Sequence, residues 1–392
     1  MKNLHCELLS YLARWRSYWS CFFDKQLHTA KRRESMIYNL IDELEKRSSH
    51  IRGMKLKTEL SNSELSEHPF NLATNPDDLD TICCTLDHLI SACGLTINDA
   101  KSLVRTLTNQ RSFYGSYCEL RAYGWLHRQG VNFHTQIPLT NVDVLNPNGC
   151  KIDGRINKPL IYFDIKAFGF QEYVTERFRS SLEERLPGMT VTIDGSMDLD
   201  VTDISEHAFR TIESLATSMK NGGTHQISQL NWTIHVKRSQ SVSSSIQEIN
   251  PYCLAKENRY YPFRSARQFT RNDAFLLVFP YSTAFNRWMG QDFVGSTEIT
   301  LRSLARRAFM QMCHDQTSAS KFDKSVANNV TVADAAKLLS ALLFIDLDKE
   351  TTGWLFLNPR ATHRLTKYHM DQIFGFLWPH SLVFDDFGYD NY

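Results

Sequence analysis

The chain lacks the short motifs that mark several large enzyme classes. Its 392 residues contain no G-x-x-x-x-G-K-[ST] loop and no strand-linked G-x-G-x-x-G, so the sequence predicts no built-in ATP or dinucleotide site. The G-x-S-x-G nucleophile elbow is also missing, which argues against a serine hydrolase of the α/β type. No internal repeat is present, so a repeat architecture is not expected.

Disulfide and zinc patterns are missing as well. The nine cysteines include no C-x-x-C pair, and the adjacent Cys83 and Cys84 are poorly placed to bond to each other. The 14 histidines include no H-x-x-x-H pair, so no zinc site is expected. Unpaired thiols are typical of a reducing compartment, and we therefore expect a cytoplasmic protein.

Long apolar runs and an excess of one charge are absent too. The longest nearly apolar run, from Ala335 to Ile345, is interrupted by Lys337 and falls short of the roughly 20 residues of a membrane-spanning helix, so we expect no membrane association. Glu7 and Arg14 interrupt the apolar N-terminus, which a secretory signal does not tolerate. The 44 basic and 43 acidic residues give a net charge of +1, so contact with a nucleic acid would need local basic clusters.

What is present is the composition of an ordinary folded protein, with 42% hydrophobic and 22% charged residues. Leu8, Leu9, Leu12 and Trp15 recur at helical spacing, as do Leu40, Ile41 and Leu44. We therefore expect residues 1–108 to form a helical N-terminal domain or arm. From residue 109 onward, helix and strand signals alternate, and we expect the segment "VADAAKLLSALLF", residues 332–344, to be helical. We therefore expect residues 109–392 to form an α/β domain with insertions, built on a mixed central sheet flanked by helices.

Charged side chains interrupt two apolar strands in "KIDGRINKPLIYFDIKAF", residues 151–168. Side chains alternate between the faces of a strand, so Asp164 and Lys166 share one face of the second strand. The segment "GRINKP" contains the Gly, Asn and Pro of a turn, and a hairpin there would bring Asp153 close to Asp164. Two carboxylates at close range repel each other unless a cation neutralises them, and oxygen-rich sites suit Mg²⁺.

The helix expected before these strands supplies a third acid. In "SFYGSYCELRAYGWLHRQG", which Gly130 closes, Glu119 shares a helical stripe with Ala122, Tyr123 and Leu126. The glutamate is therefore expected to point inward, and an inward carboxylate needs a partner.

The order of these residues resembles the PD-(D/E)xK nuclease superfamily, whose core carries a Glu on a helix, an Asp on a strand and a (D/E)xK element on the next strand. Glu119 matches the helix acid, Asp153 matches the single acid, and Asp164 with Lys166 matches the D-x-K element. Ile152 stands where the family has its proline, a residue that ligates nothing.

The resemblance covers residues 110–170 and, more weakly, the later strands within residues 225–360. It implies a restriction-endonuclease-like fold and a Mg²⁺-dependent endonuclease, with Mn²⁺ able to substitute, that hydrolyses phosphodiester bonds of DNA in preference to RNA. Lys166 would orient the attacking water or stabilise the charge of the transition state. By analogy with the family, the protein would serve restriction or anti-phage defence in bacteria, with a companion protein as a further partner. The implied metal ligands are Glu119, Asp153, Asp164 and the backbone carbonyl of Ile165.

Two basic segments are candidates for contact with a nucleic acid. The segment "NRYYPFRSARQFTR", residues 258–271, alternates aromatic residues with arginines, which suits backbone contact and base stacking. The other segment, "TEITLRSLARRAF", places Arg306 and Arg307 away from its apolar stripe, so we expect them on the solvated side of a helix. The predicted nucleic-acid-binding residues are Arg264, Arg267 and Arg271.

One active site of this kind cuts one strand, so cleavage of both strands would imply a homo-oligomer. Two other functions stay open. The first is a catalytically inactive nucleic-acid-binding or scaffold protein that keeps the nuclease fold. The second is a glycosidase with paired carboxylates, which explains Lys166 poorly and predicts activity in EDTA.

Overall fold

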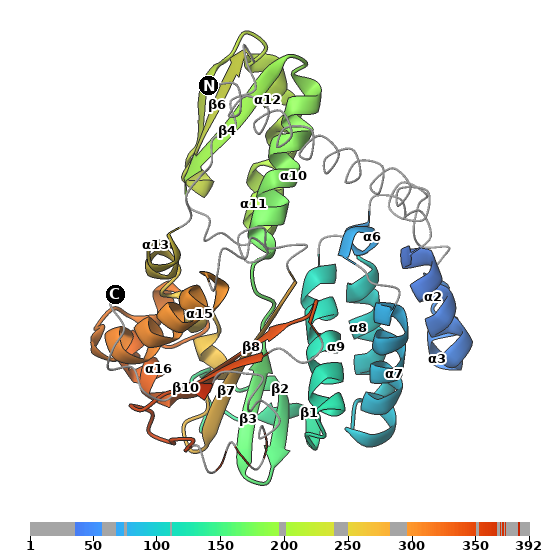
Figure 1. Ribbon diagram of the computed structural model, residues 1–392, viewed down its shortest axis with the longest axis vertical. Helices are drawn as coiled ribbons and strands as arrows, with labels where there is room; N and C mark the ends of the chain where they lie inside the picture. The colour runs from blue at the N-terminus through green and yellow to red at the C-terminus, as the bar shows by residue number, and fades with distance from the viewer. Residues whose placement is uncertain are drawn as a thin grey trace, which may run out of the picture.

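Figure 1 shows a computed structural model of the chain. It describes residues 36–56, 68–73, 77–109, 112–195, 201–238, 250–282, 296–349 and 353–366, together with 369, 371, 373 and 383–384. The predicted helical pattern around Leu8 to Trp15 lies outside these residues.

The core of the described chain is a mixed seven-stranded sheet with the order β1-β2-β3-β7-β8-β9-β10. The first three strands form an antiparallel meander, β3, β7 and β8 run parallel, and β9 is antiparallel to β8. This arrangement confirms the predicted mixed α/β sheet. The strands are β1 (Phe133–Leu139), β2 (Cys150–Asn157), β3 (Leu160–Ile165), β7 (Ala274–Tyr281), β8 (Leu339–Asp346), β9 (Gly353–Leu357) and β10 (Val383–Phe384).

Both faces of this sheet are buried, because successive residues of its central strands enter two different hydrophobic clusters. In β7, Leu276 and Val278 join one cluster with α9, while Leu277 and Phe279 join the other. Helices cover both faces, as Figure 1 shows. One face carries α7 (Asp77–Ala92), α8 (Ile97–Thr108) and α9 (Phe113–Arg128). The other carries α13 (Pro251–Glu257), η3 (Tyr261–Gln268), α15 (Ser296–Arg306), η4 (Arg307–Gln311) and α16 (Val332–Leu338).

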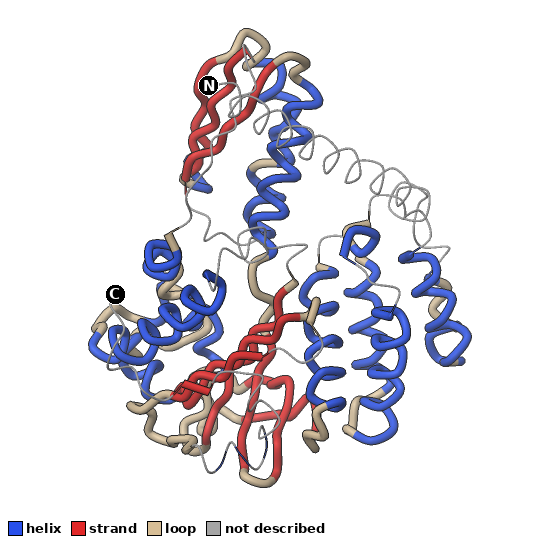
Figure 2. Tube along the Cα trace, viewed as in Figure 1, coloured by secondary structure: helices blue, strands red, loops and turns tan. Residues whose placement is uncertain are grey.

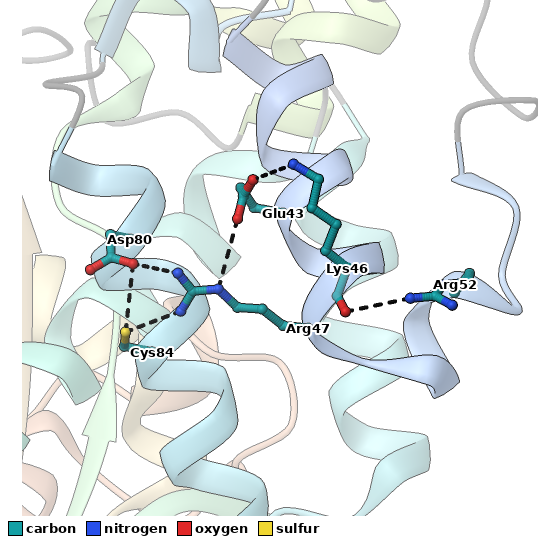
Figure 3. A network of polar contacts seen from close by, with 6 residues as sticks. All are labelled: Glu43, Lys46, Arg47, Arg52, Asp80 and Cys84. Carbon is teal, nitrogen blue, oxygen red and sulfur yellow. Dashed lines mark hydrogen bonds and ion pairs between the residues drawn. The ribbon is translucent and has the colours of Figure 1, made fainter.

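The N-terminal helices α2 (Met36–Arg47) and α3 (Ser49–Arg52) lie outside α7 and α8. The short helix α6 (Phe70–Ala73) packs its Phe70 ring on Tyr117 of α9. Leu40, Ile41 and Leu44 are buried on α2, as the spacing predicts. Arg47 of α2 binds Asp80 of α7 at 2.5 Å and lies within 3.2 Å of the Cys84 sulfur, in the polar network of Figure 3. These helices share one continuous hydrophobic cluster with α9, so the division at residue 108 stays a prediction.

A second, three-stranded sheet interrupts the connection between β3 and β7. Figure 2 shows it as a separate group of strands, which projects away from the central sheet. Its order is β4-β6-β5, with all pairs antiparallel, and α10 and α12 pack beside it. The elements of this insertion are α10 (Phe170–Arg185), β4 (Met189–Gly195), α11 (Val201–His207), α12 (Ile212–Ser218), β5 (Gly223–Ile227) and β6 (Trp232–Arg238).

The apolar run near residue 340 differs from the helical expectation. Only Val332–Leu338 is helical, capped by the Thr331 hydroxyl, and Leu339–Asp346 forms the central strand β8 with every residue buried. A strand covered on both faces reads as a continuous apolar run, which periodicity cannot distinguish from a buried helix. None of the described helices is both long enough and apolar enough to cross a membrane.

Candidate active site

Strands β2 and β3 form the predicted hairpin, but Gly154, which we assigned to the turn, is not part of that turn. Gly154 lies inside β2, opposite Phe163, and the turn follows Asn157. A Cβ at residue 154 would lie 2.2 Å from the Phe163 ring, so the glycine makes room for that ring. The hairpin thereby aligns Asp153 with the end of β3.

Asp164 is fully buried at the end of β3, and its two oxygens have different partners. Its Oδ2 lies 2.5 Å from the Lys166 ammonium, and its Oδ1 accepts a hydrogen bond of 2.8 Å from Nε2 of Gln268. The Lys166 side chain is 31% exposed, so the ion pair joins a buried carboxylate to a partly exposed lysine. Burial and the neighbouring Asp153 raise the pKa of Asp164 well above its usual range, and Lys166 opposes that shift.

Asp153 is fastened to the backbone of the adjacent strand. Its Oδ2 accepts a hydrogen bond of 2.7 Å from the Ile165 amide, and the hydroxyl of Tyr123 on α9 donates to its backbone carbonyl at 2.8 Å. The side chain therefore lies beside the D-x-K segment. The Ile165 amide belongs to the same peptide as the Asp164 carbonyl. The hydrogen bond to Asp153 therefore fixes the peptide that follows Asp164.

Glu119 faces the same group from α9. Burial first, and then Asp153, raise its pKa to about 8, although the Lys166 ammonium opposes the shift. Its Oε1 lies 3.4 Å from Nε2 of Gln136, a long hydrogen bond from strand β1. Gln136 has a positive φ of 54°, an uncommon backbone conformation for a residue with a side chain. Strained backbone of this kind is frequent beside functional groups.

A cavity of about 410 Å³ opens onto these residues. Glu119, Gln136, Asp153 and Lys166 line one side of it. A wall formed by α8 and the start of α9 carries several hydroxyl groups. The residues of that wall include Asp99, Ser102, Thr106, Ser112 and Ser116.

The charges of this group suit a divalent cation. Asp153 lies close enough to Glu119 and Asp164 to raise the pKa of both, and the Lys166 ammonium beside these three carboxylates can balance only one negative charge. Carboxylate and carbonyl oxygens are the ligands that Mg²⁺ prefers. Among the described residues, however, no three His, Cys, Asp or Glu side chains stand together as a ready-made metal site. To coordinate a metal ion, Asp164 in particular would have to weaken its contact with the Lys166 ammonium.

Two features of the site were not foreseen from the sequence. Gln268 contacts Asp164 across 104 residues of chain, and no local pattern marks it. The wall from α8 lies within residues 1–108, where the sequence offered no chemical motif. Its hydroxyl residues follow the polar stripe of an amphipathic helix, which is a weak signal on its own.

The three predicted nucleic-acid-binding arginines lie at or next to η3. Arg264 covers the ring of Tyr261, with its guanidinium carbon 5.4 Å from the ring centre, and the Tyr261 hydroxyl donates to the Ala167 carbonyl beside the cavity. Arg267 is exposed and lies 3.5 Å from the Ser325 hydroxyl. Arg271 is exposed as well, and its Nε donates to the Val144 carbonyl at 2.9 Å.

Arg306 and Arg307 do not lie on a solvated helix face, so that expectation is wrong. They are 8% and 3% exposed, and Arg307 donates to the side chain of Gln311 at 3.2 Å. The helix turns wider over Arg307–Gln311, where its backbone is a π-helix. The apolar stripe of Leu301 and Leu304 is buried, as its spacing predicts.

Comparison of the chain with protein families, with curated proteins and with solved structures found no match for it.

Proposed function

We propose that this chain is a Mg²⁺-dependent endonuclease that hydrolyses phosphodiester bonds of DNA on a restriction-endonuclease-like fold. The observation that carries the proposal is the convergence of Glu119, Asp153 and Asp164 around the single ammonium of Lys166, beside a cavity. The mixed sheet supports it, because β2 and β3 supply the acids and α9 supplies the glutamate in the order of the family.

Each residue has a defined part in this proposal. Asp153, Asp164 and the Ile165 carbonyl would hold the metal, with Glu119 completing the shell directly or through water. Bound Mg²⁺, or Mn²⁺ in its place, would polarise the scissile phosphate and acidify a water molecule. Lys166 lines the cavity, and its ammonium would stabilise the negative charge that develops on the phosphate.

The choice of DNA over RNA, the role in bacterial restriction or anti-phage defence and the companion protein follow from the family resemblance. A homo-oligomer follows from the need to cut two strands with two sites. Arg264, which stacks on Tyr261 next to the Ala167 wall of the cavity, is the arginine best placed to guide a nucleic-acid backbone toward the site.

The test is a cleavage assay on plasmid, linear, single-stranded and RNA substrates with Mg²⁺. Asp164→Asn and Lys166→Met keep the size of each side chain and remove its charge. We expect each to lower kcat by about 10²- to 10³-fold or more, the typical cost of losing a charge that stabilises the transition state. Asp194→Asn and Lys46→Met serve as controls, since these side chains are 69% and 68% exposed on other elements.

The second candidate function is a nucleic-acid-binding or scaffold protein without turnover. The lack of a ready-made three-ligand group among the described residues favours it. In that case no metal-dependent cleavage occurs, and Asp164→Asn binds DNA as tightly as the parent chain. Cleavage that needs Mg²⁺ and is lost in Asp164→Asn decides for the nuclease.

A further inference from the structure

Asp164 is held from two sides, and the second partner comes from a distant element. Lys166 pairs with Oδ2, while Nε2 of Gln268 donates to Oδ1 at 2.8 Å. A carboxylate with one fixed donor can still rotate about that contact. Two donors on different oxygens fix both the plane of the carboxylate and the direction of its remaining lone pairs.

Gln268 itself is held firmly in place. It ends η3, whose Phe263 and Ala266 are fully buried in the second hydrophobic cluster. The backbone amide of Arg267 donates to Asp323 at 3.0 Å, next to the glutamine. A side chain mounted on such an element has little freedom, and Gln268 is only 6% exposed.

The same short helix also contacts the end of the D-x-K segment. The Tyr261 hydroxyl donates to the Ala167 carbonyl at 2.8 Å, and the Tyr261 ring packs edge to face on Phe168 at 4.9 Å. One element therefore fixes both the backbone after Lys166 and the carboxylate before it.

The Gln268 amide donates to Asp164 while its own oxygen is left without a partner in the described part of the chain. Its Oε1 is buried and has no hydrogen-bond partner among the residues that the structure describes. A buried amide that only filled space would be replaced without loss by an apolar side chain of the same size. Unsatisfied polar atoms of this kind are uncommon in folded proteins, and each calls for an explanation.

We propose that Gln268 is a positioning residue that orients Asp164 toward the metal ion. This inference rests on the proposed function, because it assigns Asp164 as a metal ligand. Groups that hydrogen-bond to metal ligands typically change metal affinity by about 10- to 100-fold when they are removed. Gln268 does not touch the substrate in this scheme and acts through Asp164 alone.

The test is Gln268→Met, which keeps the length of the side chain and removes its N–H donor. Mn²⁺ binding to the full chain is measured without substrate by titration calorimetry, and the Mg²⁺ dependence of cleavage is measured separately. We expect the Mn²⁺ dissociation constant and the Mg²⁺ half-saturation to rise about 10- to 100-fold in the variant. At saturating Mg²⁺, kcat should return to within about threefold of the parent value, because the metal then holds Asp164 in place.

Gln316→Met is the matched control, since the Gln316 amide contacts only the His314 carbonyl at the surface, at 3.5 Å, among the described residues. A purely structural role of Gln268 would lower the melting temperature and kcat while leaving both metal constants unchanged, and that result overturns the inference. If the parent chain and Gln268→Met bind Mn²⁺ with equal dissociation constants, the inference about Gln268 is overturned, but the proposed nuclease still stands. A parent chain that binds no Mn²⁺ overturns the nuclease and this inference together.

Discussion

Gly154 and Phe163 face each other across the β2–β3 ladder, and the Phe163 ring occupies the space where a Cβ of residue 154 would lie. The ring also packs edge to face on Tyr123 and Phe133, so it cannot move aside freely. The hairpin that carries two of the three acids therefore depends on a residue without a side chain next to Asp153.

Gly154→Ala should destabilise the fold, because its Cβ would overlap a ring that is packed on several sides. Overpacking of a core costs about 1–3 kcal/mol, and the free energy of unfolding in urea measures it. Gly115→Ala is the control: a Cβ there meets no atom within 4 Å, and alanine favours a helix. Adding Phe163→Leu to Gly154→Ala should recover part of the loss. Equal stability of Gly154→Ala and the parent would show that the ring adjusts without cost.

His68 should make the fold sensitive to acid. It is 1% exposed, with Nε2 donating to the Thr108 carbonyl and Nδ1 accepting from the Phe70 amide, so it is neutral in the folded chain. Burial lowers its pKa from 6.5 to about 4, and the unfolded chain therefore binds more protons between these values. The stability contributed by neutral His68 is complete above pH 6.5 and is lost as the pH falls toward 4.

The loss of stability from this histidine amounts to roughly 3 kcal/mol over that interval. Urea unfolding at a series of pH values measures it, with His68→Gln and the exposed His225→Gln compared. The His68 variant should show a smaller loss of stability on acidification than the parent, whereas the His225 variant should follow the parent. Equal slopes in all three proteins would contradict the assignment of His68 as the acid-sensitive group.

Arg264→Ala and Arg267→Ala should weaken DNA binding with little effect on stability. Each phosphate contact that is lost lowers the slope of log K against log salt by about 0.9, which fluorescence anisotropy at several salt concentrations determines. Arg271→Ala is expected to differ, because its Nε also holds the Val144 carbonyl at 2.9 Å and its loss should lower stability as well. Unchanged salt slopes in Arg264→Ala and Arg267→Ala would show that these two arginines do not contact the DNA backbone.

Removal of divalent metal should abolish cleavage completely. Without the cation, nothing in the site polarises the scissile phosphate or acidifies a water molecule, and the raised pKa values of Glu119 and Asp164 favour their neutral, protonated forms. Activity is measured after dialysis against EDTA and again after adding Mg²⁺ or Mn²⁺, which should both restore it. DNA cleavage that persists in EDTA would contradict the metal-dependent mechanism.

The sequence predicted the parts of the fold that depend on local patterns. The stripe with Ala122 and Leu126 placed Glu119 on the inner side of α9, and alternation placed Asp164 and Lys166 together. These patterns work because a helix or a strand repeats its geometry over a few residues. The central strand β8 was read as helix, since a run buried on both faces has no polar residues to reveal its period.

The rest of the site depends on contacts between distant segments, which local patterns cannot reveal. Gln268 reaches Asp164 only because β3 and β7 lie parallel and η3 precedes β7. The cavity wall from α8 likewise depends on how α8 packs beside α9. Arg306 and Arg307 are buried at the point where α15 passes into the π-helix of Arg307–Gln311, and no residue pattern predicted this change of helix type.

The crossover from β3 to β7 carries a whole additional sheet, yet the two strands do not rely on it for their alignment. Backbone bonds from Lys166 to Val278 and from Phe168 to Pro280 extend the pairing beyond the strand itself. Since each doubling of a connecting segment adds only about 0.6 kcal/mol of closure cost, a longer or shorter insertion costs the fold little. The backbone pairing of β3 with β7 then keeps Asp164 and Lys166 in the same register whatever the length of the segment between the two strands.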